Sequence, residues 1–272
     1  MSFATVMVSV DIDGESDARI RLAAQLADRF ASDLIGISAA ILPPYPAETG
    51  YFVTGLAVER ERRDIEAALA RAEMTFRGIA GVDRKGLEWR SGIELPNSYV
   101  ESQARAADLL LIGRQAGDVS RSLDSGGVVL RAGRPVLVVP PNIDALSGER
   151  VIVGWKDTRE ARRALRDALP FLEGAETVTI AEISDLASEV DAGRRAGDVV
   201  RYLQRHQVQV GATIAAHPKS GVADELIRLA RAEGADLIVA GAYGHSRLGE
   251  WVFGGVTRDL LASSPVCCLL AH

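Results

Sequence analysis

The sequence has few cysteines, few histidines and few aromatic residues. Two of its 272 residues are cysteine, four are histidine, and aromatic residues make up 5%. The cysteines, Cys267 and Cys268, are adjacent in an apolar run, and the histidines are scattered, so no set of side chains has the spacing of a tetrahedral zinc site. We therefore expect no metal site and a reduced, cytoplasmic chain. The cysteines are interpreted as buried small side chains, with a vicinal redox pair as the alternative.

Long apolar runs and an excess of positive charge are also missing. No run approaches the roughly 18 residues of a membrane span, and the first residues lack the basic region of a signal peptide. The net charge of -6 leaves no surplus of cations to neutralise a nucleic-acid backbone or an anionic bilayer. We expect neither nucleic acid nor a membrane as a partner. With 47% hydrophobic and 25% charged residues, the composition is that of a globular protein.

Motifs of common catalytic and phosphate-binding sites are absent as well. The sequence contains no G-x-S-x-G nucleophile motif and no G-x-x-x-x-G-K-[ST] phosphate loop, and no G-x-G-x-x-G follows the first apolar run of either half. The carboxylates between residues 59 and 66 alternate with arginines and are interpreted as a solvated helix face. We expect no catalytic residue.

What the sequence does contain is an internal repeat. The segment Ala107–Gly113 recurs as Ala235–Gly241, and Gly126–Val128 recurs as Gly254–Val256, in both cases 128 positions later. Each copy is followed by an apolar run that begins with proline. Two matched blocks at one offset indicate a duplicated domain.

The boundary between the copies is predicted near residue 145. Residues 140–149 are rich in turn-forming residues and are interpreted as a linker. We assign residues 1–141 to the first domain and residues 149–272 to the second. The first is longer because of Pro43–Phe52, a segment rich in proline, glycine and tyrosine that is either a surface loop or a lid.

Each half alternates short apolar runs with stretches of helical periodicity. In the second half, strands are expected near 151–155, 177–183, 208–216, 236–241 and 266–271, and helices near 159–172, 188–206, 221–233 and 254–263. Strands joined by crossover helices form a parallel sheet covered on both faces. The predicted fold class is α/β, with two tandem Rossmann-like domains, each a five-stranded parallel sheet with helices on both faces.

A glycine-rich stretch follows the fourth predicted strand of the second half. Gly241 ends the strand, Gly244 permits a turn, and Gly254 and Gly255 stand where the next helix begins. Ligands in such sheets bind beyond the carboxyl ends of the strands. Backbone N–H groups in a glycine loop, together with a helix N-terminus, attract an anion without any cationic side chain. The stretch therefore predicts a phosphate site.

At this stretch the sequence resembles a known family. The order strand, Gly241-x-x-Gly244, nine residues, Gly254, small residue, helix is similar to the G-x2-G-x9-G-[S/T] signature of the universal stress protein family. The whole chain resembles the tandem, two-domain form. The resemblance implies strand order 3-2-1-4-5, pairing of the two domains through their last strands, and binding of an adenine nucleotide, ATP or AMP, with Mg as a further possibility.

Residue by residue, the second domain keeps most of the signature. Gly255 stands at the Ser/Thr position, and Thr257 could supply the missing hydroxyl or satisfy a backbone N–H at the helix start. Val256 and His245 complete the predicted loop. Lys156 stands where members of the family that bind ATP place an aspartate at the end of the first strand.

The first domain departs in a different way. Asp11 is well placed for the aspartate, and Gly113 and Gly126 match the first and third glycines. Ala116 replaces the second glycine, and Gly127 stands at the Ser/Thr position. This loop is predicted to be the weaker cradle.

Two hypotheses about function remain open. The first is a stress-response protein in which adenine nucleotide bound to the second domain modulates contact with an unknown protein partner. The second is a scaffold that binds no nucleotide and acts by protein contacts through its pseudo-dimeric shape, with a further homodimer possible. An ATP-consuming enzyme is a third, weaker reading that lacks a nucleophile or base, so at most weak ATP hydrolysis is expected.

Overall fold

The computed structural model describes residues 2–12, 16–42, 55–114, 123–184, 189–216, 221–244 and 255–272. The segment Pro43–Phe52, together with Ala116, His245 and Gly254, lies outside these residues. Among the described helices, none combines the length and the apolar character that crossing a bilayer requires.

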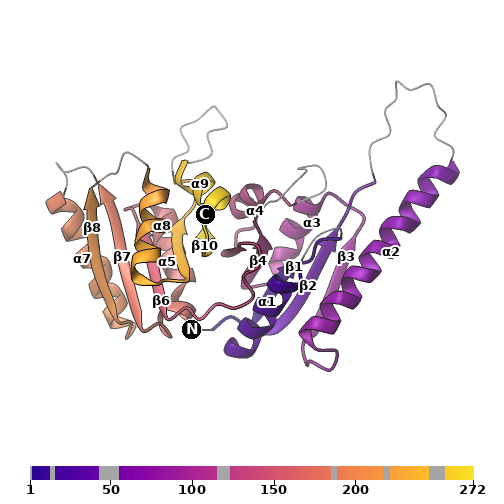
Figure 1. Cartoon of the computed structure of the whole chain (residues 1–272), viewed down its shortest axis with the longest axis horizontal. Coiled ribbons are helices and arrows are strands. Elements are labelled where there is room, and N and C mark those ends of the chain that lie inside the picture. Colours follow the sequence, from indigo (N-terminus) through magenta and orange to yellow (C-terminus); the bar gives the residue numbers. More distant parts are fainter. Residues whose placement is uncertain are drawn as a thin grey trace, which may run out of the picture.

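The first half contains alternating strands and helices along the chain (Figure 1). They are β1 (Thr5–Ser9), α1 (Asp17–Phe30), β2 (Asp33–Ala39), α2 (Gly55–Ala80), β3 (Leu87–Gly92), α3 (Pro96–Gln103), the 3-10 turn η2 (Ala104–Ala106), β4 (Leu109–Gly113), α4 (Ser125–Arg131) and β5 (Val136–Val139).

The second half repeats this order. It contains β6 (Arg150–Trp155), α5 (Arg159–Asp167), α6 (Leu169–Leu172), β7 (Thr177–Ser184), α7 (Glu189–Arg205), β8 (Val210–Ala216), α8 (Val222–Glu233), β9 (Leu237–Gly241), α9 (Gly255–Ser263) and β10 (Cys267–Ala271). The predicted strands and helices of this half are confirmed within two residues, with one correction. The helix expected over 159–172 is divided after Asp167, because Pro170 in the first turn of α6 has no N–H to continue the hydrogen bonding of α5.

All ten described strands form one sheet, in the order β3-β2-β1-β4-β5-β10-β9-β6-β7-β8. Each half has the expected order 3-2-1-4-5, and its strands pair in parallel. The halves meet where β5 and β10 pair antiparallel, with Cys268 opposite Val138. The expected pairing through the last strands is therefore present within the chain.

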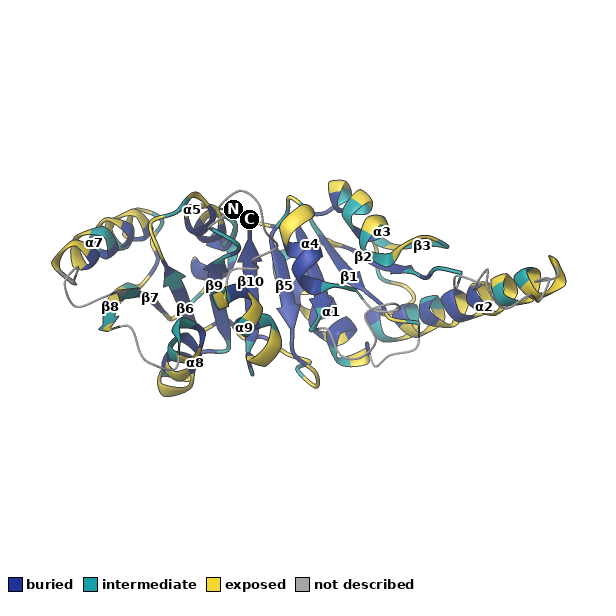
Figure 2. Cartoon of the chain, turned by 90° about the horizontal axis from the view of Figure 1, so that it is seen from above, coloured by how far each residue is buried: buried dark blue, intermediate teal, exposed yellow. Residues whose placement is uncertain are grey.

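The core lies on both faces of this sheet. Leu109 and Leu111 belong to one buried cluster, and Leu110 and Ile112 belong to the other, as expected for a strand buried on both faces. Both clusters contain residues from both halves. In Figure 2 the central strands are dark blue and the edge strands β3 and β8 are mostly teal and yellow, whereas α2 projects beyond the sheet and its outer part is exposed. The two halves thus share a continuous core.

Aromatic side chains add a contact between the halves. Phe30 of α1 packs edge-to-face against Phe171 of α6, with ring centroids 5.2 Å apart, and Phe3 lies 5.1 Å from Phe30. The Arg29 guanidinium lies 5.9 Å from the Phe171 ring and donates to the carbonyl oxygen of Ser147. This cluster fixes the linker against both domains.

The repeated Ala-Asp pair has a structural role. The carboxylate of Asp108 accepts hydrogen bonds from the backbone N–H groups of Ala4 and Thr5, at 2.8 and 3.1 Å. That of Asp236 accepts from Ser147 and Gly148 in the same way, at 2.7 and 3.1 Å. Each aspartate therefore ties the beginning of its domain's first strand to the strand that pairs with it.

Candidate functional site

A cleft of about 620 Å³ lies at the carboxyl ends of β6, β7 and β9 in the second domain. Six predicted site residues line it: Lys156, Gly241, Gly244, Gly255, Val256 and Thr257. The cleft is also lined by side chains that we did not single out from the sequence as site residues, among them Thr158, Glu182 and Arg195. The structure therefore brings together every predicted site residue of this domain that it describes, since His245 and Gly254 lie outside the described residues.

Gly241 has a packing requirement of its own. A Cβ atom placed on it would lie 2.4 Å from the backbone nitrogen of Ala161 and 2.6 Å from the carbonyl carbon of Glu160. The first turn of α5 thus packs directly against the end of β9. Glycine is needed here for the approach of the helix, whether or not a ligand binds.

Thr257 fastens the loop to the start of α9. Its hydroxyl accepts a hydrogen bond from the backbone N–H of Tyr243 at 3.3 Å, and its side chain is buried. Tyr243 has a φ of 57°, the left-handed region in which the chain turns back after β9. The hydroxyl therefore satisfies a backbone N–H that follows β9, and not one at the start of α9 as predicted. Its hydrogen remains able to donate to a ligand.

Gly255 is the first residue of α9, and its surroundings are open. A Cβ atom placed there would have no described heavy atom within 4 Å. Among the described residues, none would clash with the side chain of the Ser or Thr that the family signature places at this position.

Strand register supports the correspondence between Lys156 and Asp11. Val6 pairs with Leu109 and Val151 pairs with Leu237, which are equivalent residues of the repeat. Counting five residues along each first strand leads to Asp11 and Lys156. The lysine lines the cleft directly after β6.

A buried carboxylate stands beside the loop. A Cβ atom on Gly244 would lie 3.1 Å from Oε2 of Glu160, whose side chain is 5% exposed. Burial by itself would raise the pKa of Glu160, but hydrogen bonds from Arg159, its own backbone N–H and Thr158 hold that pKa below its usual value. Thr158 also caps α5, accepting from the N–H of Ala161 at 3.3 Å. The N-terminus of α5 is therefore already balanced by protein groups.

The far end of the cleft holds two buried polar side chains. Glu182 of β7 accepts hydrogen bonds at Oε1 from Nε and a terminal nitrogen of Arg195 on α7, with the Nε contact at 2.9 Å. Among the described residues, neither Oε2 of Glu182 nor Nε1 of Trp155 has a hydrogen-bond partner. Sequence reasoning missed Glu182, although one charged residue within the apolar strand Thr177–Ser184 is an available signal.

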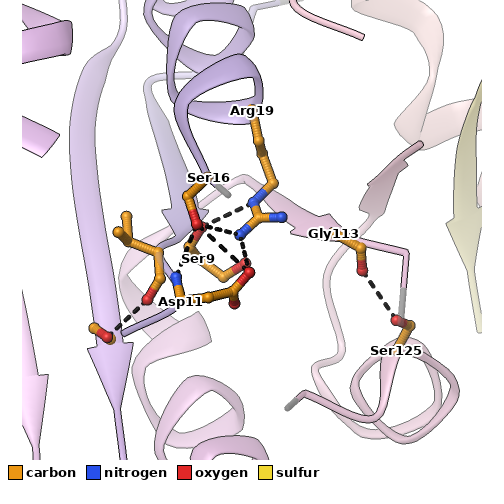
Figure 3. A network of polar contacts seen from close by, with 8 residues as sticks. Ser9, Asp11, Ser16, Arg19, Gly113 and Ser125 are labelled. Carbon is orange, nitrogen blue, oxygen red and sulfur yellow. Dashed lines mark hydrogen bonds and ion pairs between the residues drawn. The ribbon is translucent and has the colours of Figure 1, made fainter. Parts of the chain in front are cut away.

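The corresponding region of the first domain is filled by its own side chains (Figure 3). Arg19 is 7% exposed, and its guanidinium donates to the carboxylate of Asp11 at 2.9 Å, to the hydroxyl of Ser16 at 3.0 Å and to the carbonyl of Ser9 at 2.9 Å. A Cβ atom on Gly113 would lie 2.1 Å from this guanidinium. The cavity beside Asp11 measures about 20 Å³, the size of a water molecule and not of a nucleotide.

The other two glycines predicted as site residues of the first domain lie inside α4. Gly126 and Gly127 are buried, and a Cβ atom on Gly127 would lie 2.5 Å from the carboxylate of Asp124. The amide of Asn97 bonds both the N–H and the carbonyl of Asp124, at 2.9 and 3.0 Å. Protein groups thus surround the first turn of this helix, and its role as the weaker phosphate site stays a prediction.

Comparison with known proteins gives the family of the second domain. Residues 148–272 match the model of the universal stress protein family. The second half of the chain is thus similar to the universal stress protein family. A search of curated protein sequences found no match.

Solved structures extend this likeness over the whole chain. A universal stress protein from Archaeoglobus fulgidus DSM 4304 is 14% identical, with a TM-score of 0.73 over 98% of this chain and 95% of that one. The functionally unknown protein PA1789 from Pseudomonas aeruginosa PAO1 is 14% identical, with a TM-score of 0.61 over 99% of this chain and 92% of that one. At these identities the similarity is one of fold, and it is consistent with two tandem Rossmann-like domains.

Proposed function

We propose that the second domain binds one adenine nucleotide, ATP or AMP, and that its occupancy modulates contact with a protein partner in a stress response. The observation that carries the proposal is the contrast between the two domains. The second has a cleft of about 620 Å³ and the first a cavity of about 20 Å³ at the equivalent strand ends. Small-molecule sites commonly measure about 300–1,000 Å³.

The chemistry of the cleft supports phosphate at one end. Gly241, Gly244 and Gly255 expose backbone at the end of β9 and at the start of α9, a helix of nine residues. Unpaired N–H groups of a helix start attract anions. Lys156 lines the same cleft, and Thr257 lies in the first turn of α9. The residues present therefore fit a nucleotide phosphate, and binding, without catalysis, is the proposed activity.

Ligand binding modulates a partner only if the two states differ in affinity for it. The cleft is bordered by Tyr243 and Gly244 after β9 and by the first residues of α9, and α9 packs against α4 beside the antiparallel β5–β10 junction. A nucleotide held there contacts elements next to the junction of the two halves. We propose that this region carries the effect of the ligand to the partner surface.

The scaffold hypothesis is favoured by one observation, the Glu160 carboxylate beside Gly244, which opposes an anion at that glycine. Nucleotide release and binding decide between the two. The purified protein is denatured and its supernatant examined for adenine nucleotide, and ATP binding is measured for the wild type and for Gly244→Val. We expect the wild type to bind and Gly244→Val to lose most of that affinity.

The matched control is Gly211→Val. Gly211 lies in the edge strand β8, near its amino end and away from the cleft, and has open space at its Cβ position. This variant should bind as the wild type does. No released nucleotide and no binding at millimolar ATP would favour the scaffold, and binding lost on changing Asp11 but kept in Gly244→Val would move the site to the first domain.

A further inference from the structure

Glu182 and Trp155 form a polar pair at the end of the cleft away from the glycine loop. They are directly paired residues of the neighbouring strands β7 and β6. Glu182 is 4% exposed and Trp155 is 7% exposed, and both line the cleft. Among the described residues, the carboxylate oxygen Oε2 and the indole Nε1 each lack a hydrogen-bond partner. Buried polar atoms of this kind are uncommon, and a ligand that pairs with them removes the cost of leaving them unpaired.

The position of this pair relative to the loop sets which part of a nucleotide it meets. In the sheet, β6 lies between β9, which ends in Gly241, and β7, which carries Glu182. Two strand spacings amount to about 10 Å. A ribose with its base spans a similar distance. If the phosphates bind at the glycine loop, the base therefore lies at the end of β7.

The Arg195 guanidinium fixes what the carboxylate can do. Its two hydrogen bonds both go to Oε1 of Glu182, which orients the carboxylate and leaves Oε2 as the acceptor for a ligand. An ionised carboxylate accepts and does not donate. A ligand group that pairs with Oε2 must therefore carry an N–H or O–H donor. The indole N–H of Trp155 is a donor, so the ligand needs an acceptor next to that group.

We infer that Glu182 is a specificity-determining residue of this cleft, which selects bases bearing an exocyclic amino group through a hydrogen bond to Oε2. The inference rests on the proposed nucleotide site. Adenine offers an amino donor next to ring nitrogen acceptors, which complements Glu182 and Trp155 together. Hypoxanthine reverses this pattern, with a carbonyl where adenine has the amine and an N1–H donor where adenine has a ring acceptor, so its oxygen would face the carboxylate. Unsubstituted purine keeps the ring acceptors but has no amino donor.

The test compares three triphosphates, those of adenosine, inosine and purine riboside, on the full chain. The wild type should bind ATP about 10- to 100-fold more tightly than the other two, the range expected for one hydrogen bond to a charged group. In Glu182→Gln, the amide carbonyl faces Arg195, which only donates, and the amide NH2 replaces Oε2. The preference for ATP over the inosine nucleotide should then fall at least about tenfold.

Two further variants separate the hydrogen bond from charge and folding. Glu182→Ala removes the acceptor without adding a donor, so ATP binding should weaken while binding of the purine riboside nucleotide changes less than twofold. Glu101→Gln is the matched control, because Glu101 forms a carboxylate–arginine pair with Arg131 in the first domain. It should bind all three nucleotides as the wild type does. Melting temperatures without nucleotide report whether each variant is folded.

The outcomes are distinct for the two proposals. If all three nucleotides bind the wild type alike, and Gly244→Val abolishes this binding, the nucleotide site stands and the role of Glu182 is overturned. If Glu182→Gln weakens all three equally, the carboxylate holds the ribose, which also overturns base selection. If none of them binds, both proposals are overturned.

Discussion

The guanidinium of Arg19 lies 2.9 Å from the carboxylate of Asp11, and this ion pair fills the part of the first domain that corresponds to the open cleft of the second. The side chain of Arg19 is 8% exposed, whereas that of Asp11 is 42% exposed. Asp11, the residue whose position best matches a nucleotide-binding aspartate, thus has an internal cation as its partner. This pair explains why the two halves differ although their strands and helices follow the same order.

Replacing Arg19 by alanine should destabilise the protein. The change leaves the buried carbonyl of Ser9 without its donor, at a cost of about 1–3 kcal/mol for an unsatisfied group. Chemical denaturation measures this loss. Arg21→Ala on the same helix is the control, since its pair with Asp144 is 3.5 Å long and exposed, and such pairs contribute about 0–1 kcal/mol. Equal effects of the two changes would contradict the packing role of Arg19.

Replacing Gly255 by serine should strengthen nucleotide binding. No described heavy atom lies within 4 Å of the Cβ position, so the described residues leave room for the side chain, and its hydroxyl adds a donor at the start of α9. A hydrogen bond to a charged phosphate predicts an affinity gain of about tenfold for ATP, measured by titration calorimetry. Gly78→Ser, in α2 and equally open at Cβ, should leave the affinity unchanged. A loss of affinity in Gly255→Ser would show that the loop binds its ligand in another way.

The two cysteines should be unreactive in the folded protein. Burial raises the pKa of Cys268 to about 11, and it raises that of Cys267 further, with Cys268 as the second cause. Because the thiolate is the reactive form, its fraction at pH 8 is small, and reagents must also reach a buried group. A thiol-specific disulfide reagent at pH 8 should react slowly with the native protein and rapidly with two thiols in guanidinium chloride. Rapid reaction in the native state would contradict this prediction and favour the alternative that Cys267 and Cys268 form a vicinal redox pair.

Replacing Asp236 by alanine should loosen the linker from the second domain. The carboxylate accepts hydrogen bonds from the N–H groups of Ser147 and Gly148 and from the Ser147 hydroxyl, and we expect a loss of about 1–2 kcal/mol in the free energy of unfolding. Asp198→Ala, which removes an exposed i, i+3 partner of Arg201 on α7, should cost less than about 0.5 kcal/mol. Hydrogen exchange at Ser147 and Gly148 should rise only in the first variant.

Most of the fold could be predicted because the patterns that indicate strands and helices are local in the sequence and occur in both halves. Apolar runs such as Leu109–Gly113 identify buried strands, and the repeat at Asp108 and Asp236 fixes equivalent positions in the two halves. The break before α6 follows from Pro170, a signal that the helical periodicity of residues 159–172 obscured.

The site was only partly predictable, because its decisive contacts join residues far apart in the sequence. Arg19 reaches Gly113 across 94 positions, and no pattern along the helix indicates that its guanidinium points inward. Glu182 and Arg195 are paired by the packing of α7 on β7. Gly241, in contrast, was found correctly as the end of a strand, although the closest atoms to its Cβ position belong to α5.

The antiparallel junction between β5 and β10 also fixes the stoichiometry of the molecule. Two separate subunits joined through such strands dissociate on dilution, and identical ones carry identical sites. Here the linker makes the association intramolecular, so it persists at every protein concentration. Every molecule therefore contains one open half and one filled half, an asymmetry that no homodimer of either half alone can have.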